Sequence, residues 1–572
     1  MKRIIKRLEG FIESIEGLNL NLIWWILGFL AIVFARNFLS TPSVSALMFF
    51  DHFLLFYVGL FFAITLLLHF LTGERIERVS KAVVTFWFII LLTPILDSLF
   101  FGGGRKLSYF LNAHEIPYTL LNFFNPFVQF EGVSPGLRIE VVIVVILAVF
   151  YTYIKSRSAV KSICGFVGSY LIIIFIGFLP AIFATVFSGV APELAYDKVF
   201  RFGGIVQTGS QGLALLFTFV SSFLLCIWLF RYDRKKWKAA VSNLRPLRSI
   251  HYVGMTLLGI LLGFWLFRDA YPVVFGTPID FLACLGLLFS VFFAYQSAVA
   301  VNDIFDIESD KISNNSRPLV KKKLSSGDVK ILAVIYMFIA LLFAINVKYS
   351  CFSLVLVSII LSLVYSVPPL KLKRFFPVST FIIALAALVT LLTGFSIFGG
   401  WKSVYIFPKS LTLLVLVIFT LAGTVKDLKD FEGDKRTGIK TLPVLLGRHR
   451  GKIVIALFVL LSYILIAPII RMPILFIPAI VFGILSVFII LKKELSEKPI
   501  FVLYFAFVII LAFFIRKNID TLRTSRVKHQ IDAVGHFLSG ETYFRRGKYG
   551  HAINEYKKAI LYSYKDERIR LQ

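Results

Sequence analysis

Two short acidic segments of the sequence share one spacing of aspartates. Residues 302–310 read NDIFDIESD, and residues 427–434 read DLKDFEGD. Both contain the pattern D-x-x-D-x-x-x-D, formed by Asp303, Asp306, Asp310, Asp427, Asp430 and Asp434. In an α-helix, offsets of three and four residues place side chains on one face, one turn apart. We therefore expect each segment to present three carboxylates on one helical face.

Three carboxylates on one face repel each other unless a cation neutralises them. Ligand sets made only of oxygen favour Mg²⁺ over zinc or copper, and Mg²⁺ prefers a few carboxylates together with substrate phosphates. Two such helices face to face would hold two or more Mg²⁺ ions around a diphosphate and stabilise it as it departs. The alternatives are a solvated acidic helix end and an ion site of a transporter. The repetition of the pattern about 120 residues later favours the diphosphate site.

Basic residues flank both acidic segments. Arg317 and Lys321–Lys323 follow the first segment, and Lys435, Arg436 and Lys440 follow the second. Between the segments, residues 365–374 read YSVPPLKLKR. Fixed cations beside a metal-bound diphosphate would orient it and absorb its negative charge. The competing interpretation is the ordinary excess of Lys and Arg in the cytoplasmic loops of membrane proteins.

The elements that position these segments must be membrane-spanning helices. The chain has 572 residues, of which 58% are hydrophobic and 16% charged, a composition that excludes a soluble globular enzyme, a disordered chain and a disulfide scaffold. A helix crosses a bilayer with about 20 apolar residues. We count fifteen candidate runs, near 19–39, 48–71, 82–103, 139–155, 162–187, 211–230, 253–267, 281–302, 329–346, 351–366, 378–398, 411–426, 453–470, 474–491 and 500–515. The sequence thus predicts an all-α polytopic membrane protein, with six spans followed by a block of nine.

Loop charges predict the orientation of these spans. The net charge is +29, and the positive charge lies in short loops between apolar runs, which indicates a membrane protein rather than a nucleic-acid-binding one. With a cytoplasmic N-terminus, the inner loops carry roughly 37 Lys and Arg residues and the outer loops roughly 10. Fifteen spans would place the C-terminus outside, yet its flank, residues 516–528, is basic. Either the rule fails at this flank or the number of spans is off by one.

We expect four regions along the chain. Residues 1–230 form a six-span membrane domain in which no motif predicts a role, and residues 231–252 form a basic cytoplasmic linker. Residues 253–520 form the nine-span domain that carries both acidic segments. Residues 527–572 form a short helical tail of soluble composition.

The tail contains one readable pattern of small and aromatic residues. It is similar to one tetratricopeptide unit, a pair of antiparallel helices, in the spacing of Gly540, Tyr543, Gly547, Tyr549, Ala552, Tyr556 and Ala559. A single unit cannot bury its own face, so we expect the tail to contact a partner protein or the rest of the chain. The alternative is a plain amphipathic helical tail.

Residues 245–515 resemble the UbiA superfamily of intramembrane prenyltransferases. NDIFDIESD is similar to the family's first aspartate-rich motif, N-D-x-x-D-x-x-x-D, and residues 426–447, KDLKDFEGDKRTGIKTLPVLLG, are similar to its second. The stretch YSVPPLKLKR resembles the Tyr…Lys motif between them, and nine spans is the family's number. The sequence departs from the family after Arg317, where Lys321 and Lys322 occupy the positions of a frequent Ser-Gly.

The resemblance implies Mg²⁺-dependent transfer of an isoprenyl group from a prenyl diphosphate to a lipid-soluble or small acceptor, in a site that opens toward the cytoplasm. It implies that Asn302, Asp306 and Asp310 bind one face of the Mg²⁺–diphosphate and that Asp430 and Asp434 bind the other. Asp303 and Asp427 would add metal ligands. The residues that would contact the diphosphate are Arg317, Tyr365, Lys371, Lys373 and Arg374.

The sequence leaves the acceptor open: the resemblance allows aromatic acids, quinone precursors, tetrapyrroles, glycerol-phosphate lipids and sugar phosphates, with an aromatic or quinone precursor favoured. A cation-coupled transporter that uses the acidic clusters as ion sites is the alternative function. A transporter should have paired broken helices near the bilayer midplane, whereas the acids here lie at inner helix ends beside basic residues. We expect a multi-pass protein of a bacterial or archaeal cell membrane, in contact with membrane lipids.

Overall fold

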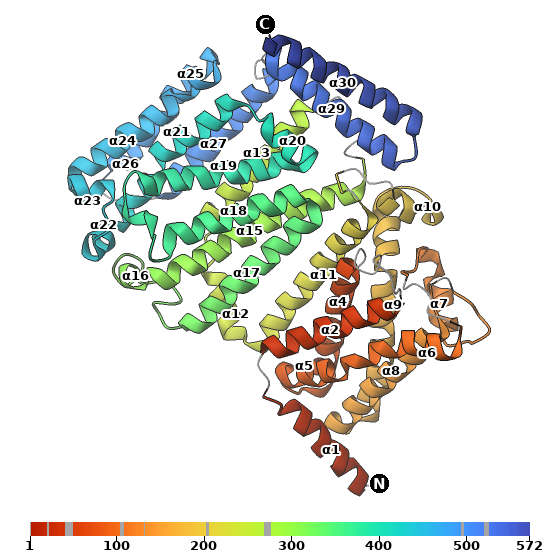
Figure 1. Ribbon diagram of the computed structural model, residues 1–572. Helices are drawn as coiled ribbons and strands as arrows, with labels where there is room; N and C mark the ends of the chain where they lie inside the picture. The colour runs from red at the N-terminus through yellow and green to blue at the C-terminus, as the bar shows by residue number, and fades with distance from the viewer. Residues whose placement is uncertain are drawn as a thin grey trace. The chain divides into compact units, whose positions relative to one another are not determined.

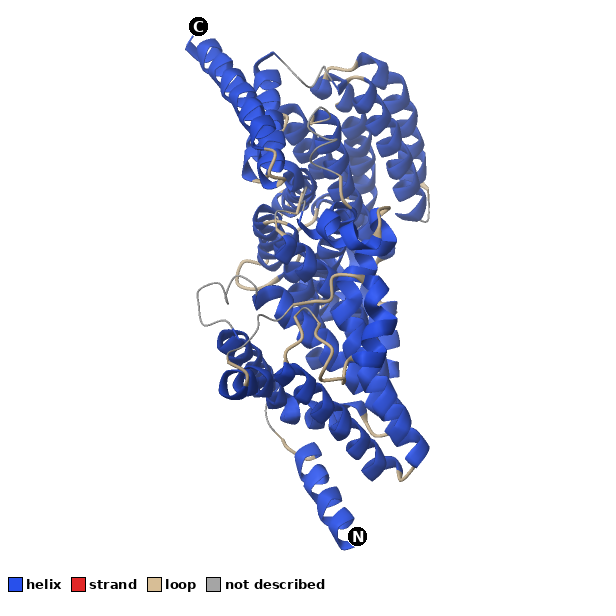
Figure 2. Ribbon diagram, turned by 90° about the vertical axis from the view of Figure 1, so that its right-hand side faces the viewer, coloured by secondary structure: helices blue, strands red, loops and turns tan. Residues whose placement is uncertain are grey.

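The fold consists of helices joined by short loops. The computed structural model describes residues 2–19, 22–40, 50–102, 108–130, 132–201, 205–206, 208–267, 276–492, 497–519 and 525–571. Figure 2 shows no strand within these ranges, where one isolated bridge pairs Phe375 with Lys440. The prediction of an all-α chain is confirmed.

The described ranges contain the expected set of apolar helices. Fourteen helices are long and apolar enough to cross a membrane, or fifteen if one bent pair forms a single span. The bent pair is α21 (Lys409–Ala422) and α22 (Val425–Thr437), which meet at an angle of 45°. The predicted run 411–426 therefore ends early, and the chain turns there to start the second acidic helix.

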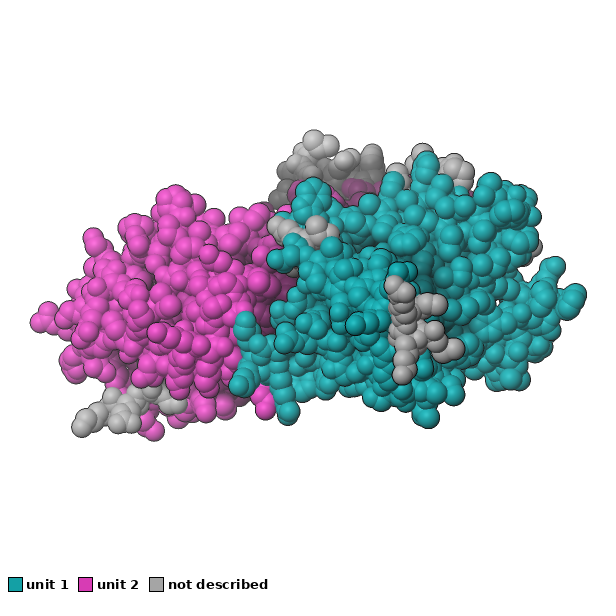
Figure 3. Space-filling model, turned by 90° about the horizontal axis from the view of Figure 1, so that it is seen from below, with its two compact units in different colours: residues 1–237, 277–282 teal, residues 238–276, 283–572 magenta. Residues whose placement is uncertain are grey.

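The chain divides into two compact units, residues 1–237 with 277–282 and residues 238–276 with 283–572 (Figure 3). The helices of the first unit are α1 (Lys2–Glu16), α2 (Leu22–Ser40), α4 (Phe50–Thr72), α5 (Ile76–Thr85), η1 (Phe86–Leu91), α6 (Leu92–Phe100), η2 (Ala113–Glu115), α7 (Ile116–Asn122), α8 (Pro135–Ser156), α9 (Ala159–Ser188), α10 (Pro192–Tyr196), η3 (Asp197–Arg201) and α11 (Gly209–Tyr232). The amphipathic α1 is tied to the end of α8, where Lys155 Nζ lies 2.7 Å from Glu16 Oε2 and Arg157 Nη2 lies 2.6 Å from Glu9 Oε2.

Helices α12 (Arg234–Ser242) and α15 (Pro278–Phe305) each have residues in both units, and the second unit contains the acidic segments. Figure 1 labels the helices of this unit. Its helices are α13 (Pro246–Leu266), α15 (Pro278–Phe305), α16 (Ile307–Ser313), α17 (Ser326–Val347), α18 (Tyr349–Ser366), η4 (Leu372–Arg374), α19 (Val378–Gly399), α20 (Trp401–Tyr405), α21, α22, α23 (Leu442–Leu446), α24 (Arg448–Ile464), α25 (Ile466–Ile470), η5 (Pro473–Leu475), α26 (Phe476–Leu491), α27 (Glu497–Lys517), α29 (Ser525–Arg545) and α30 (Tyr549–Leu571).

Helix α19 is the centre of the second unit, with 72% of its apolar stretch buried. Its backbone touches that of α13 through two glycines: a Cβ at Gly259 would lie 2.0 Å from the Leu391 carbonyl oxygen, and a Cβ at Gly394 would lie 1.9 Å from that of Thr256. Small residues at such crossings let membrane helices approach closely. This contact fixes the face of α13 that is turned toward the site described below.

The two acidic segments differ in their local structure. The second lies on one continuous helix, α22, as predicted. The first does not, because α15 ends at Phe305 and α16 begins at Ile307, with the non-helical Asp306 (φ −111°, ψ 11°) between them. The expectation of three carboxylates on one uninterrupted helical face is therefore wrong for the first segment. Despite the break, Asp303 stays close to Asp310, because Arg317 Nη1 contacts both carboxylates.

The tail forms a pair of helices that lie side by side (Figure 1). A Cβ at Gly540 of α29 would lie 2.7 Å from the Tyr556 ring of α30, so the glycine admits the ring, and the Tyr556 hydroxyl donates a hydrogen bond to Glu541 at 2.7 Å. The pair packs beyond the C-terminal end of α19, where Lys402 Nζ lies 3.2 Å from the centre of the Phe537 ring. Because η4 precedes the first residue of α19, the tail and η4 lie at opposite ends of that helix, about 33 Å apart along it.

Candidate active site

A cavity of about 500 Å³ lies among the helices of the second unit. Nine of the residues that the sequence singled out line it: Asn302, Asp306, Asp310, Arg317, Tyr365, Lys373, Asp427, Asp430 and Asp434. They come from α15, the break at Asp306, α16, the loop after α16, α18, η4 and α22. The fold thus brings together motifs that are more than 100 residues apart in the sequence.

The Asn314 side chain bridges the two acidic helices. The Asn314 amide nitrogen lies 3.2 Å from Asp310 Oδ1 and 3.2 Å from Asp430 Oδ1, and it donates to both. The helices touch at Gly433, whose amide nitrogen donates to Ser313 Oγ at 3.1 Å. A Cβ at Gly433 would lie 2.5 Å from the Oγ atoms of Ser309 and Ser313. The close contact sets the separation of the two rows of acids.

Basic side chains neutralise the first row. Arg317 forms ion pairs with Asp310 and, at 2.9 Å, with Asp303. Lys373 forms an ion pair with Asp306 and donates to Asn302 Oδ1 at 3.0 Å. The left-handed Lys371 (φ 36°) precedes η4, which turns Lys373 inward.

Burial of these cations away from water disfavours their charge. Burial lowers the pKa of Lys373 to about 8, against the opposing effect of Asp306. Burial, followed by the neighbouring Arg245, also lowers the pKa of Arg317. At neutral pH both remain cations, and both lack the full solvation that would compete with an anionic ligand.

The second row has a different partner. Lys426 is hydrogen-bonded to the Tyr365 hydroxyl and lies 3.8 Å from Asp427 Oδ1. The other carboxylate oxygen of Asp427, Oδ2, is buried and has no hydrogen-bond partner within the described ranges. A buried carboxylate oxygen without a donor is costly unless a cation or a donor from a ligand satisfies it.

Three predicted residues lie outside the cavity lining. Asp303 is buried and held by Arg245, by Arg317 and by the Asn243 amide at 2.8 Å. Lys371 lies 3.9 Å from Asp306 and donates to the Phe305 carbonyl oxygen. Arg374 is exposed, and its carbonyl oxygen accepts a hydrogen bond from the Lys440 amide at 3.1 Å.

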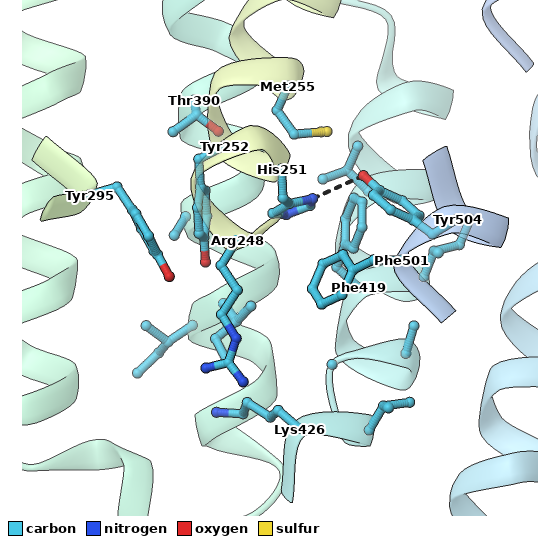
Figure 4. A pocket seen from close by; sticks show the side chains of 18 of the residues that line it. Arg248, His251, Tyr252, Met255, Tyr295, Thr390, Phe419, Lys426, Phe501 and Tyr504 are labelled. Carbon is cyan, nitrogen blue, oxygen red and sulfur yellow. Dashed lines mark hydrogen bonds between the residues drawn. The ribbon is translucent and has the colours of Figure 1, made fainter. Parts of the chain in front are cut away.

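The cavity also contains residues that the sequence analysis missed. Arg248, His251, Tyr252 and Met255 line it from α13, and Tyr504 lines it from α27 (Figure 4). Their offsets of three, four and seven residues from Arg248 place the α13 residues on one helical face. This spacing was available in the sequence, but positions 248–252 lay in what looked like a linker.

In the loop after Arg317, where the sequence departs from the family motif, the backbone at Lys322 can be compared with that of the family's frequent glycine. Lys322, at the position of the family's frequent glycine, has φ 56°, in the left-handed region that favours glycine. The loop therefore has the conformation that a glycine would adopt at this position, with a lysine in its place.

The oxygen-rich set fits Mg²⁺ shared with a substrate. Within the described ranges, no three acidic, histidine or cysteine side chains converge to enclose a metal ion by themselves. Two facing rows of aspartates with an unsatisfied buried oxygen on Asp427 suit an ion that takes a few carboxylates and completes its shell with water and phosphate oxygens.

Residues 256–509 match the sequence model of the UbiA prenyltransferase family. The digeranylgeranylglyceryl phosphate synthase of Pyrococcus horikoshii is 28% identical over 227 residues, which cover 40% of this chain and 76% of the relative. The enzyme of the same description from Methanocaldococcus jannaschii is 30% identical over 201 residues, which cover 35% of this chain and 67% of the relative. A solved structure of a UbiA homolog from Archaeoglobus fulgidus bound to GPP and Mg²⁺ aligns with 50% of this chain and 100% of that chain, at 20% identity and a TM-score of 0.39. The tetratricopeptide resemblance of the tail finds no support in these similarities.

Proposed function

Because the chain belongs to the UbiA prenyltransferase family, we propose that its acid-lined cavity is where an isoprenyl group passes from a prenyl diphosphate to an acceptor, with release of diphosphate. The protein is a membrane prenyltransferase, and this replaces the alternative of a cation-coupled transporter. The observation that carries the proposal is the Asn314 amide, which joins Asp310 and Asp430 and so sets the two acidic helices face to face.

The geometry supports a division of roles among the site residues. Asp306 and Asp310 on one side, and Asp427, Asp430 and Asp434 on the other, would hold Mg²⁺, with Asn302 beside them. Bound Mg²⁺ supplies positive charge that stabilises the departing diphosphate. Lys373 and Arg317 would bind the diphosphate oxygens, and Lys426 would act through Tyr365 and Asp427.

Three predicted residues receive other roles in this proposal. Asp303 would position Arg317 rather than bind metal, because its carboxylate is already held by two arginines and an amide. Lys371 would support Lys373 from outside the cavity, next to Asp306. Arg374 would act only at the rim, since its side chain is exposed.

The rest of the cavity lining suits the isoprenyl chain. Tyr252, Tyr295 and Phe419 line the part of the cavity on the side of Arg248 away from Lys426 (Figure 4). Apolar walls exclude water from the reacting carbon, and aromatic faces stabilise positive charge that develops on it. The aromatic or quinone-type acceptor favoured by the sequence stays a prediction, and the names of the archaeal relatives favour another of the open classes, a glyceryl phosphate.

Turnover is expected to stop when a chelator removes divalent metal and to return when Mg²⁺ is added in excess. The measurement is mass spectrometry of the lipids made by purified protein from mixed prenyl diphosphates and a panel of aromatic and glyceryl phosphate acceptors. Calcium, which prefers more ligands and longer bonds, serves as the control and should restore far less activity. Transfer that continues in the presence of the chelator would contradict a metal site between the acidic helices.

We also propose that the diphosphate site faces the cytoplasm and that residues 1–230, 231–252 and 253–520 form a six-span domain, a linker and the prenyltransferase domain. The tail would then lie on the outer face. Its contact beyond the far end of α19, opposite η4, supports this, as does the odd number of candidate spans in the described ranges, fifteen, when the bent pair counts as one.

Cysteine labelling in intact cells tests this topology in a background without the native cysteines. An Ile553→Cys variant, at a position 53% exposed on α30, is expected to react with a membrane-impermeant maleimide. The matched Glu308→Cys variant, whose native side chain is 71% exposed beside the acids, is expected to react only after permeabilisation. Reaction of both variants on the same side of the membrane would refute the assignment.

A further inference from the structure

A histidine and a tyrosine from two distant helices meet inside the cavity. His251 of α13 and Tyr504 of α27 both line it, and His251 Nδ1 lies 2.9 Å from the Tyr504 hydroxyl (Figure 4). This is the only hydrogen bond of the His251 side chain within the described part of the chain, so Nε2 is not engaged by these residues. The ring is packed instead by aromatic neighbours, with centroids 4.8 Å from Tyr252 and 5.0 Å from Phe419.

The His251–Tyr504 pair is separated from the acidic end of the cavity by Arg248. Arg248, one turn before His251, lies between the imidazole and Lys426 (Figure 4). Lys426 in turn contacts Tyr365 and Asp427 of the acidic end. The pair therefore lies on the apolar side of the site, beside the residues that would surround the isoprenyl group.

We propose that His251 is the base that takes the proton of a hydroxyl-bearing acceptor, and that Tyr504 positions it. The inference rests on the proposed function, and it concerns an acceptor, an alcohol or phenol, that is prenylated on oxygen to give an ether.

The chemical step balances with groups present in the site. The acceptor O–H bond breaks, and its proton passes to Nε2 of His251. The acceptor oxygen forms a bond to C1 of the isoprenyl group, and the bond from C1 to the diphosphate oxygen breaks, with its electron pair leaving on diphosphate. The fixed charge of Arg248 favours the oxygen anion that develops beside it.

Tyr504 serves this step by selecting the tautomer. Nε2 can accept a proton only when Nδ1 carries the ring hydrogen and donates it to the Tyr504 oxygen. The hydrogen bond also fixes the plane of the imidazole between Tyr252 and Phe419. Tyr504 is thus a positioning residue, and His251 is the group that touches the substrate.

The test separates ionisation of the donor from transfer to the acceptor. The donor is geranylgeranyl diphosphate labelled with ¹⁸O at the oxygen bonded to C1, and the acceptor probe is geranylgeranylglyceryl phosphate. Cleavage and return of the C1–O bond scrambles the label among the diphosphate oxygens without any need for a base. In His251→Asn we expect transfer to fall about 100-fold while scrambling continues. In Tyr504→Phe we expect about a fivefold fall in transfer, the effect of one lost hydrogen bond.

Two controls tell a base apart from a packing residue. In His251→Ala, added imidazole should restore part of the transfer rate, because a free base can occupy the space of the lost ring. The exposed His449→Asn, outside the cavity, should transfer at the rate of the unmodified protein.

Transfer at the normal rate in His251→Asn, or loss of scrambling together with transfer in both His251 variants, would overturn the assignment of His251 as base. A carbon-prenylated product from a phenol would overturn the ether chemistry. Absence of both scrambling and product in the unmodified protein would instead contradict the proposed function.

Discussion

Asp434→Asn is expected to lower the rate of prenyl transfer about a thousandfold while the protein remains folded. Asp434 lines the cavity on α22 with only 7% of its surface exposed, and asparagine keeps its shape but removes the charge that would bind Mg²⁺. Asp306→Asn should have a similar effect from the opposite row, and it also leaves Lys373 without its ion pair. The measurements are the transfer rate at saturating Mg²⁺ and the melting temperature in detergent.

The chain offers matched controls on the same two helices. Glu432 of α22 and Glu308 of α16 are acidic neighbours whose side chains are 57% and 71% exposed, and each forms an ion pair with an exposed cation. Glu432→Gln and Glu308→Gln should therefore leave transfer within about twofold of the normal rate, since exposed ion pairs contribute little. Normal activity in Asp434→Asn or Asp306→Asn, or an equal loss in the glutamate controls, would refute the specific role of the two rows.

The sequence was sufficient to predict the all-α architecture and to single out nine residues that line one cavity, because both depend on short-range patterns; the roles of those residues stay predictions. Apolar runs predict spans through their length alone, and the spacing of Asp427, Asp430 and Asp434 predicts a shared face because α22 is one unbroken helix. The same spacing in the first segment did not predict that the helix ends at Phe305 and a new one starts at Ile307. The segment 302–310 contains no proline or glycine that would predict the break.

What the sequence could not provide is the identity of long-range partners. Asp303 is buried by Arg245 and Asn243, which come from about 60 residues earlier in a stretch that looked like a solvated linker. Likewise, His251 and Tyr504 are 253 residues apart, and neither lies in a motif. Their meeting depends on the glycine contact between α13 and α19 that turns one face of α13 inward.

Gly433→Leu is expected to lower prenyl transfer by more than about 100-fold without changing any charged residue. Gly433 lies where α22 touches α16, and even a Cβ there would come within 2.5 Å of Ser309 Oγ and Ser313 Oγ and 3.0 Å of the Ser309 carbonyl oxygen. A leucine side chain has no room, so the two helices must separate, and Asp430 and Asp434 move away from Asp310. The apparent affinity for Mg²⁺, measured from the dependence of rate on Mg²⁺ concentration, should fall with the rate.

A graded series shows whether the spacing of the helices is the cause. Gly433→Ala should lose less activity than Gly433→Leu, and adding Ser309→Ala and Ser313→Ala should restore part of the loss, because it removes the two nearest atoms and leaves only the Ser309 carbonyl oxygen at 3.0 Å among the contacts named. Gly254→Ala provides the control, since a Cβ at that helical position meets nothing within 4 Å. Undiminished transfer in Gly433→Leu would mean that the two rows of acids need no fixed separation, and shared coordination of one diphosphate between them would then be untenable.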